Sequence, residues 1–542
     1  MNSTTPPGGT STLPPRSLFA ANPLRWLAIF GPGAVIASLT IGVGELVFSA
    51  RAGALFGYRL LWFFVLVLLL KWALVFASAR HIVLTGAHPF QRWMELPGPR
   101  GWLPLVFFLL AAPCFPIWVC FHSGTLGTLL GALTGTEHAW RGAAHLVWGM
   151  GALTLVMGLC FAGGYATLEK AQLVIVVLML ASVGAAVFFV NVDWVALLRG
   201  LAVPEAAKYP HWINQEIYSE IASRSPWLET TTYVGVIGGS SYDYLAYVSY
   251  LRDKRWGRAG ASVATADDLQ GVACDRQHPT RLWLRAPLVD CTLSFLAVLV
   301  FCAVFVICGA AVLGPQHKVP AGANLLSLQA EFVAAVHPGL KFLYFAGAFL
   351  AVFGTLYGTI EVAPTVLREL VLALRPNQPD AMQARLRRWS VTWAGAGGLL
   401  ILLWCFVYHL RSESDKPPGL IAILTPANLF TGVLGCGIVC ALNVWMDQRF
   451  LPRALRMRWL LLLLSAVGAT LFTVLGLKAY LDDRGGVPAL CILFGTLALG
   501  LAGAALLPKR DGKSREELNA TLEATSPDPQ SRAGCAGDSR SK

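Results

Sequence analysis

Apolar segments of about 20 residues or more recur along the whole chain, and each is long enough to cross a membrane as a helix. Of the 542 residues, 56% are hydrophobic and only 13% are charged, which leaves too little polar surface for a water-soluble globule. We therefore predict an all-α integral membrane protein with about twelve transmembrane helices. The segments cover residues 26–56, 60–83, 102–133, 143–164, 168–192, 228–251, 286–313, 339–372, 388–409, 419–446, 457–480 and 487–507.

The basic residues predict how the chain is oriented. A net charge of +12 is also found in nucleic-acid-binding proteins, but here Lys and Arg gather between the apolar segments, so we predict no nucleic-acid partner. The positive-inside rule then predicts a multi-pass protein of the cell (inner) membrane with both termini in the cytoplasm. The basic loops follow spans 2, 6, 8 and 10 and hold Arg80, Arg92, Arg100, Arg252, Lys254, Arg255, Arg258, Arg375, Arg385, Arg387, Arg388, Arg449, Arg453, Arg456 and Arg458.

Two spans contain residues that weaken a helix. Span 1 reads "TIGVGELVFSA" and places Gly42 and Gly44 next to Glu45, while span 6 reads "GGSSYD" and ends that run at Asp243. Glycine inside a helix costs about 1 kcal/mol against alanine, and a membrane tolerates unwound backbone only where it lines protein or a water-filled cavity. Two broken helices five spans apart therefore predict a transporter built from an inverted repeat, with its site near the membrane midplane.

This repeat gives the expected organisation of the chain. Spans 1 to 5 and 6 to 10 form the two repeats, spans 11 and 12 are peripheral, and polar terminal segments are disordered in the cytoplasm. The predicted units are residues 1–24 (arm), 25–192 (first repeat), 193–227 (extracytoplasmic loop), 228–446 (second repeat), 447–508 (peripheral spans) and 509–542 (tail).

The segment "GPGAVIASLTIGVGELVFSARAGALFGYRLLW" resembles the first-helix region of the Nramp (natural resistance-associated macrophage protein) family of divalent-metal transporters. Weaker similarity continues in "YATLEKAQ" at residues 165–172 and "GVIGG" at residues 235–239. The resemblance implies a leucine-transporter-type 5+5 inverted repeat with broken helices 1 and 6. It also implies a divalent cation as substrate, with no resident cofactor. The shared positions are Gly31-Pro32-Gly33, Ala52-Gly53-Ala54, Phe56-Gly57-Tyr58 and Leu60-Leu61-Trp62.

The ligand motifs of the family are not kept. Its Asp-Pro-Gly-Asn falls on Gly42-Val43-Gly44-Glu45, and its helix 6 methionine falls on Tyr242. Loss of the soft thioether and gain of carboxylates favour a hard cation, Mg²⁺ or Mn²⁺. Span 3 lacks the acidic residues of proton-coupled members, so we predict a divergent branch that is not proton-coupled in the usual way.

The candidate metal site combines charged and neutral oxygens. Glu45 and Asp243 are the expected charged ligands, although either carboxylate would also serve as a helix cap. Backbone carbonyls and hydroxyls complete the shell through waters, Tyr242 lines or seals the site, and the resemblance adds Asn428. The candidate set is Glu45, Asp243, Gly42, Gly239, Ser240, Ser241, Tyr242 and Asn428.

Four other polar residues lie in or beside apolar segments. Lys71 in span 2 and Glu361 in span 8 are expected to form a buried ion pair. His122 in span 3 is expected to be a structural histidine with satisfied ring nitrogens. Asp290, which opens span 7, is expected at the membrane interface.

Two other functions remain open at this point. The glycine-rich break is also typical of amino-acid transporters, in which Glu45 would meet the amine of the amino acid or of another small organic solute. Loss of the family's ligands is also compatible with a receptor or scaffold that no longer transports. An enzyme is not predicted, because HExxH, GxSxG, P-loop and zinc-spaced Cys/His motifs are missing from the sequence. The predicted partners are therefore a divalent metal ion and the lipid bilayer.

Overall fold

The computed structural model describes residues 13–19, 26, 41–162, 177–214, 216–375, 379–411, 418–483 and 485–506. Every regular element within these ranges is a helix. The predicted arm and tail, the Gly31-Pro32-Gly33 motif and the "YATLEKAQ" stretch lie outside the described residues.

Nine helices of the described chain are long and apolar enough to cross a membrane. Their positions agree with the apolar segments of the sequence, since hydrophobic length alone selects them. They are α3 (Leu61–Thr85), α5 (Trp102–Thr134), α6 (Ala144–Ala162), α13 to η5 (Pro279–Leu313), α16 (Leu340–Leu374), α17 (Asp380–Arg411), α18 to α19 (Leu420–Phe450), α20 (Trp459–Asp482) and α21 (Gly486–Ala505).

The other three expected spans are incomplete or interrupted. Spans 1 and 5 each continue into residues outside the described ranges, and their described parts are η3 (Gly44–Ser49) with α2 (Ala50–Phe56), and the apolar helix Val177–Ala186. Span 6 is divided into α10 (Pro226–Val236) and α11 (Ser241–Asp253). A total of twelve spans and the inverted repeat therefore stay predictions.

Shorter helices connect the long ones. The expected extracytoplasmic loop contains α8 and α9, and α12 follows α11 on the other side of the break. The bounds are α4 (Pro89–Trp93), α8 (Trp194–Ala202), α9 (Ser219–Ala222), α12 (Ala266–Cys274), α13 (Pro279–Trp283), α14 (Arg285–Cys308), η5 (Gly309–Leu313), α15 (Ala330–Ala334), α18 (Leu420–Asn428), η7 (Leu429–Leu434) and α19 (Gly435–Phe450).

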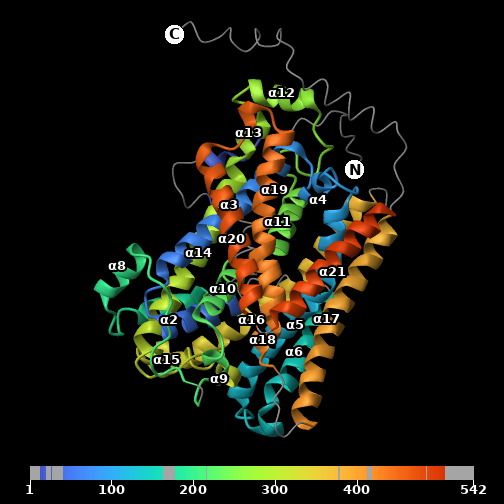
Figure 1. Cartoon of the computed structure of the whole chain (residues 1–542). Coiled ribbons are helices and arrows are strands. Elements are labelled where there is room, and N and C mark those ends of the chain that lie inside the picture. Colours follow the sequence, from blue (N-terminus) through green and yellow to red (C-terminus); the bar gives the residue numbers. More distant parts are fainter. Residues whose placement is uncertain are drawn as a thin grey trace.

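The long helices run between two ends of the molecule, with α12 and α13 at one end and α9 and α15 at the other (Figure 1). On one side, α5 packs against α6, α16, α17 and α21. The two halves of span 6 follow one another through the centre, where α10 packs against η3 and η7 and α11 packs against α3 and α16. The break of span 6 and the described part of span 1 therefore lie inside the bundle.

Contacts join the basic loops that follow spans 2, 6, 8 and 10. The Arg80 guanidinium lies 2.8 Å from a carboxylate oxygen of Asp447, which connects α3 with α19. Arg252 at the end of α11 pairs with Glu369 of α16 at 2.8 Å. The backbone N–H of Arg258 donates to the Val83 carbonyl at 3.0 Å and connects these two pairs of loops, so the four basic segments lie at the same end of the bundle, as the alternation of the loops predicts.

Asp290 is not interfacial, and this prediction is wrong. The residue has no exposed surface, and one of its carboxylate oxygens accepts a hydrogen bond from the Tyr247 hydroxyl at 2.9 Å. The contact between α11 and α14 buries the carboxylate. The Tyr247 hydroxyl on α11 compensates for the hydration that the carboxylate loses.

Candidate functional site

The break in span 6 consists of the four residues between α10 and α11. Gly238 and Gly239 adopt φ angles of +80° and +97°, a backbone conformation that residues with a Cβ atom rarely adopt. The paired glycines therefore turn the chain out of the helix, and helical hydrogen bonding resumes only at Ser241. Several backbone N–H and C=O groups are left without helical partners inside the bundle, where each needs another partner.

A small cavity of about 40 Å³ lies beside this break. It is enclosed by α5, α16, the start of η3 and the residues around the break. Oxygen, nitrogen and sulfur atoms from three helices face the same space, together with aromatic rings. The lining residues are Gly44, Cys114, Phe115, Trp118, His122, Val236, Gly239, Ser240, Tyr242, Asp243, Thr355 and Thr359.

Asp243 lines this cavity from the first turn of α11. One of its carboxylate oxygens accepts a hydrogen bond from the backbone N–H of Ser240 at 2.7 Å. This is the cap expected at the start of a helix, and the partial positive charge of the helix N-terminus stabilises the carboxylate. The side chain is only partly buried, so it is the carboxylate that a cation in the cavity would meet.

Glu45 lies on the other side of the break and is completely buried. Its Oε1 atom accepts a hydrogen bond from Gly238 N–H at 3.0 Å, and Oε2 accepts one from Gly42 N–H at 3.5 Å. The carboxylate thereby connects the described part of span 1 to the break of span 6. Glu45 and Asp243 bind N–H groups two residues apart in the chain, so both lie at the same break, although Glu45 does not line the cavity.

The two backbone carbonyls in the candidate set both have hydrogen-bond partners. The carbonyl of Gly42 accepts the Leu46 N–H at 3.0 Å, within the first turn of the helix. The carbonyl of Gly239 accepts the Lys71 ammonium at 2.7 Å and the Tyr244 hydroxyl at 3.1 Å. A metal ion would have to replace one of these donors before either carbonyl could bind it.

The remaining candidates divide between the cavity and its surroundings. Ser240 lines the cavity, and so does the ring of Tyr242, whose hydroxyl donates to the Phe107 carbonyl at 2.7 Å. Ser241 is buried against α19 outside the lining set. The Asn428 amide donates to the Thr232 carbonyl of α10 at 2.9 Å and also lies outside it.

The expected ion pair between Lys71 and Glu361 does not form. Lys71 donates from α3 to carbonyls of the break, whereas Glu361 pairs with Arg387 of α17 at 2.6 Å. The predicted pair joined two isolated opposite charges and took no account of backbone carbonyls as partners. Such carbonyls become available to a lysine only where a helix is interrupted.

His122 is not a satisfied structural histidine, and this expectation is also wrong. Its ring is buried between α5 and the cavity, and neither ring nitrogen has a hydrogen-bond partner among the described residues. The ring packs edge to face against Trp118 and Phe121, which fix its orientation. A buried imidazole without partners is costly and is available to a ligand in the cavity.

A buried ion pair outside the candidate set joins the described part of span 1 to span 6. Arg51 of α2 lies 2.5 Å from Glu229 of α10, and both side chains are almost completely buried. Arg224 approaches the same carboxylate at 3.6 Å. The pair ties α2 of span 1 to α10, the helix before the break in span 6. No local sequence pattern indicates this pair, because 178 residues separate the partners.

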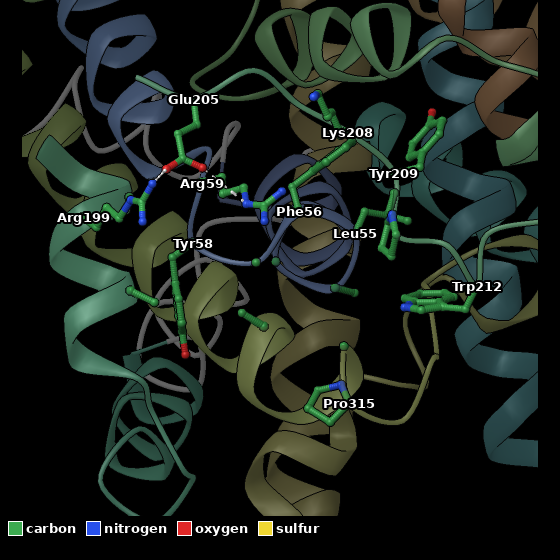
Figure 2. Close-up of a pocket in the computed structure, with 18 residues that line it drawn as sticks. Leu55, Phe56, Tyr58, Arg59, Arg199, Glu205, Lys208, Tyr209, Trp212 and Pro315 are labelled. Carbon is green, nitrogen blue, oxygen red and sulfur yellow. Dashed lines mark ion pairs between the residues drawn. The ribbon is translucent and has the colours of Figure 1, made fainter. Parts of the chain in front are cut away.

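A second cavity, of about 790 Å³, lies at the far end of α2 (Figure 2). Arg59, Arg199 and Lys208 line it, and Glu205 forms ion pairs with both arginines at 3.4 and 2.8 Å. The excess of positive charge repels a cation. The smaller cavity at the break therefore suits a metal ion better than the larger one does.

No group of three or more His, Cys, Asp and Glu side chains with metal-binding geometry occurs within the described part of the chain. The Asp243 carboxylate, the His122 imidazole and the hydroxyls of Ser240, Thr355 and Thr359 belong to residues that line the same small cavity. Such a mixed and sparse set suits an ion that passes through the site, because strong closed coordination would hold it.

The chain matches the family described as natural resistance-associated macrophage protein-like over residues 33–482. No curated protein matches it. Similar solved structures include the manganese transporter of Eremococcus coleocola in complex with an aromatic bis-isothiourea substituted compound, and two of its single-residue mutants. Each is 13% identical with a TM-score of 0.62, and the match covers 89% of this chain and 94% of the transporter, which shows a shared fold. The chain therefore belongs to the Nramp family.

Proposed function

We propose that the chain carries a divalent metal cation across the membrane by alternating access, through the cavity beside the break of span 6. The family and its manganese-transporting structural neighbours support divalent metal transport in general. The observation that carries the proposal for this chain is the position of Asp243. Its partly exposed carboxylate faces a cavity that is also lined by Ser240, Thr355 and His122, whose ring nitrogens have no hydrogen-bond partner among the described residues.

The cavity favours Mn²⁺ over Mg²⁺. A water molecule needs roughly 10–15 Å³ of such cavity volume, so a cavity of about 40 Å³ holds only a few waters and a fully hydrated ion must lose part of its hydration shell to enter. Mg²⁺ gives up its waters reluctantly and prefers an all-oxygen octahedron. Imidazole suits transition metals, so His122 supplies a nitrogen ligand that stabilises Mn²⁺ more than Mg²⁺.

Glu45 has a different role in this proposal. Its carboxylate adds negative charge next to the cavity while it holds the two interrupted spans together through Gly238 and Gly42. Asp243 binds the ion directly, and Glu45 positions the backbone around it. Gly42, Ser241 and Asn428 support the same backbone from outside the cavity.

Transport in this proposal follows the ion gradient and the membrane potential. The helix α5, which is span 3, contains no Asp or Glu between Trp102 and Thr134. The carboxylates that carry protons in coupled members of the family therefore have no counterpart there. A pH gradient alone should not drive uptake.

Uptake of Mn²⁺ and Mg²⁺ into proteoliposomes tests the proposal. We expect Asp243→Asn to reduce Mn²⁺ uptake at least tenfold, and His122→Ala to reduce Mn²⁺ uptake more than Mg²⁺ uptake. Asp268→Asn is the matched control, since this carboxylate caps α12 outside the cavity, and it should leave uptake unchanged.

Three results would contradict the proposal. Undiminished uptake by Asp243→Asn would remove the carboxylate as a ligand, and equal losses of Mn²⁺ and Mg²⁺ uptake in His122→Ala would remove the basis of selectivity. Absence of any metal flux or metal binding would favour a receptor or scaffold. Amino-acid uptake would indicate the other alternative, although a cavity of about 40 Å³ does not hold an amino acid in this conformation.

A further inference from the structure

Lys71 places a positive charge inside the break of span 6. Its side chain is completely buried in the middle of α3. The ammonium donates hydrogen bonds to the carbonyls of Ile237 and Gly239, each at 2.7 Å, and to the carbonyl of Gly235 at 3.4 Å. Its closest partners are thus neutral backbone oxygens rather than a carboxylate.

These carbonyls converge because the helix is interrupted. The last carbonyls of a helix have no intrahelical partners, and the C-terminal end of α10 carries a partial negative charge. The turn at Gly238 and Gly239 brings two further carbonyls to the same point. The Tyr244 hydroxyl shares its proton between the carbonyls of Gly238 at 2.5 Å and Gly239 at 3.1 Å, and the second of these is also bound by Lys71.

The surroundings of the ammonium are also those of a cation site. The Glu45 carboxylate binds the N–H of Gly238, between two of the carbonyls that hold Lys71. Asp243 caps Ser240 on the other side of Gly239. Several carbonyl oxygens with carboxylates nearby are the environment that hard cations prefer.

We propose that the break of span 6 contains a monovalent-cation site and that the Lys71 ammonium is its permanent occupant. A tethered ammonium takes the place that Na⁺ or K⁺ would fill, so the native break is held together without a free monovalent ion. When the lysine side chain is removed, the carbonyls of Gly235, Ile237 and Gly239 form a vacant site that a free monovalent cation fills. This inference does not depend on which ion the chain transports.

A purely structural lysine would behave differently. If Lys71 served only to join α3 to the break, its loss would weaken the fold equally in every salt. If it occupies a cation site, its loss makes stability depend on the identity of the cation. The dependence on cation identity therefore distinguishes the two roles.

The test measures thermal unfolding of the purified full chain in detergent. Lys71→Ala is compared with the native protein in NaCl, KCl, methylammonium chloride and N-methylglucamine chloride at equal ionic strength. N-methylglucamine is too large for the site. We expect one midpoint in all four salts for the native protein, and a midpoint for Lys71→Ala that is low in N-methylglucamine and rises by several degrees in at least one of the others.

Two control variants sharpen the result. Lys341→Ala removes a partly exposed lysine that pairs with Glu331, and its midpoint should be the same in all four salts. Lys71→Gln keeps a hydrogen-bond donor but loses the charge, so it should depend on the cation as Lys71→Ala does. It also provides a second variant if Lys71→Ala does not fold in N-methylglucamine.

The proposal fails if Lys71→Ala and Lys71→Gln have the same midpoint in all four salts, or if the native protein itself requires Na⁺ or K⁺. It also fails if neither variant folds in any of the salts, since no free cation would then replace the ammonium. None of these readouts involves transport, so failure here leaves the proposed metal transport standing, and failure of metal uptake leaves the cation site standing.

Discussion

At the scale of single residues, polar groups in the centre of the bundle exist because the break provides partners for them. Glu45 accepts backbone N–H groups, Lys71 donates to backbone carbonyls, and Asp243 caps α11. An isolated charge inside a membrane protein is costly, and an unpaired backbone group is costly as well. Because Gly238 and Gly239 interrupt the helix, the free backbone groups and the buried charged side chains become hydrogen-bond partners of one another.

Glu45 provides the sharpest prediction at this scale. Glu45→Ala leaves the buried N–H of Gly238 without its acceptor, which should lower the free energy of unfolding by about 1–3 kcal/mol. Glu45→Gln keeps an oxygen acceptor and should lose less. Thermal unfolding checks both, with Glu331→Ala on the surface as the control. Midpoints equal to the native value for both variants would show that the carboxylate does not hold the break.

At the scale of elements, close packing against span 7 determines the position of α2, the second half of span 1. A Cβ atom added at Gly53 of α2 would lie 2.1 Å from the Val306 carbonyl and 2.8 Å from the Ala310 nitrogen. Both neighbours are backbone atoms of α14 and η5, and they cannot move aside as a side chain can. Small residues that let helix backbones approach are typical of membrane helix interfaces.

Gly53→Ala should therefore lower the free energy of unfolding by about 1–3 kcal/mol through overpacking. The matched control is Gly151→Ala in α6, where an added Cβ meets open space and should leave stability unchanged or slightly higher. A thiol-reactive dye measures unfolding on heating, because most of the free cysteines in the described chain are buried. Equal midpoints for the two variants would contradict the close approach.

At the scale of the whole molecule, the bundle gathers its basic loops at one end. Ion pairs between Arg80 and Asp447 and between Arg252 and Glu369 join these loops, and α12 lies at the same end (Figure 1). The positive-inside rule assigns this end to the cytoplasm. Exposed Cys274, in the last turn of α12, is a native probe of that assignment.

Cys274 should react with a membrane-impermeant maleimide in inside-out vesicles and not in right-side-out vesicles. The experiment uses a Cys491→Ser, Cys535→Ser background, which removes the other exposed cysteine of the described chain and the cysteine of the predicted tail. Cys274→Ser in that background should abolish the labelling and serves as the control. Labelling only in right-side-out vesicles would reverse the predicted orientation.

Much of the fold follows from hydrophobic length. The apolar segments 102–133 and 339–372 correspond closely to α5 (Trp102–Thr134) and α16 (Leu340–Leu374), because the membrane selects helices by length and composition. The break of span 6 was also predictable, since it depends on the local properties of two glycines. The predicted pairing of Lys71 with Glu361 was wrong. The partners of Lys71 are backbone carbonyls of span 6, and the sequence does not show where these carbonyls point.

The sequence by itself determined which segments are apolar enough to span, where span 6 breaks, and the family to which the chain belongs. These features are local, and short stretches of residues contain all the information that they need. The tertiary structure alone decided that Lys71 meets the carbonyls of the break and that Arg51 pairs with Glu229. It also decided that His122 lines the cavity with no hydrogen-bond partner in the part of the chain that the structure describes. Each of these contacts requires helices distant in the sequence to meet, and their relative positions follow from the packing of the whole bundle.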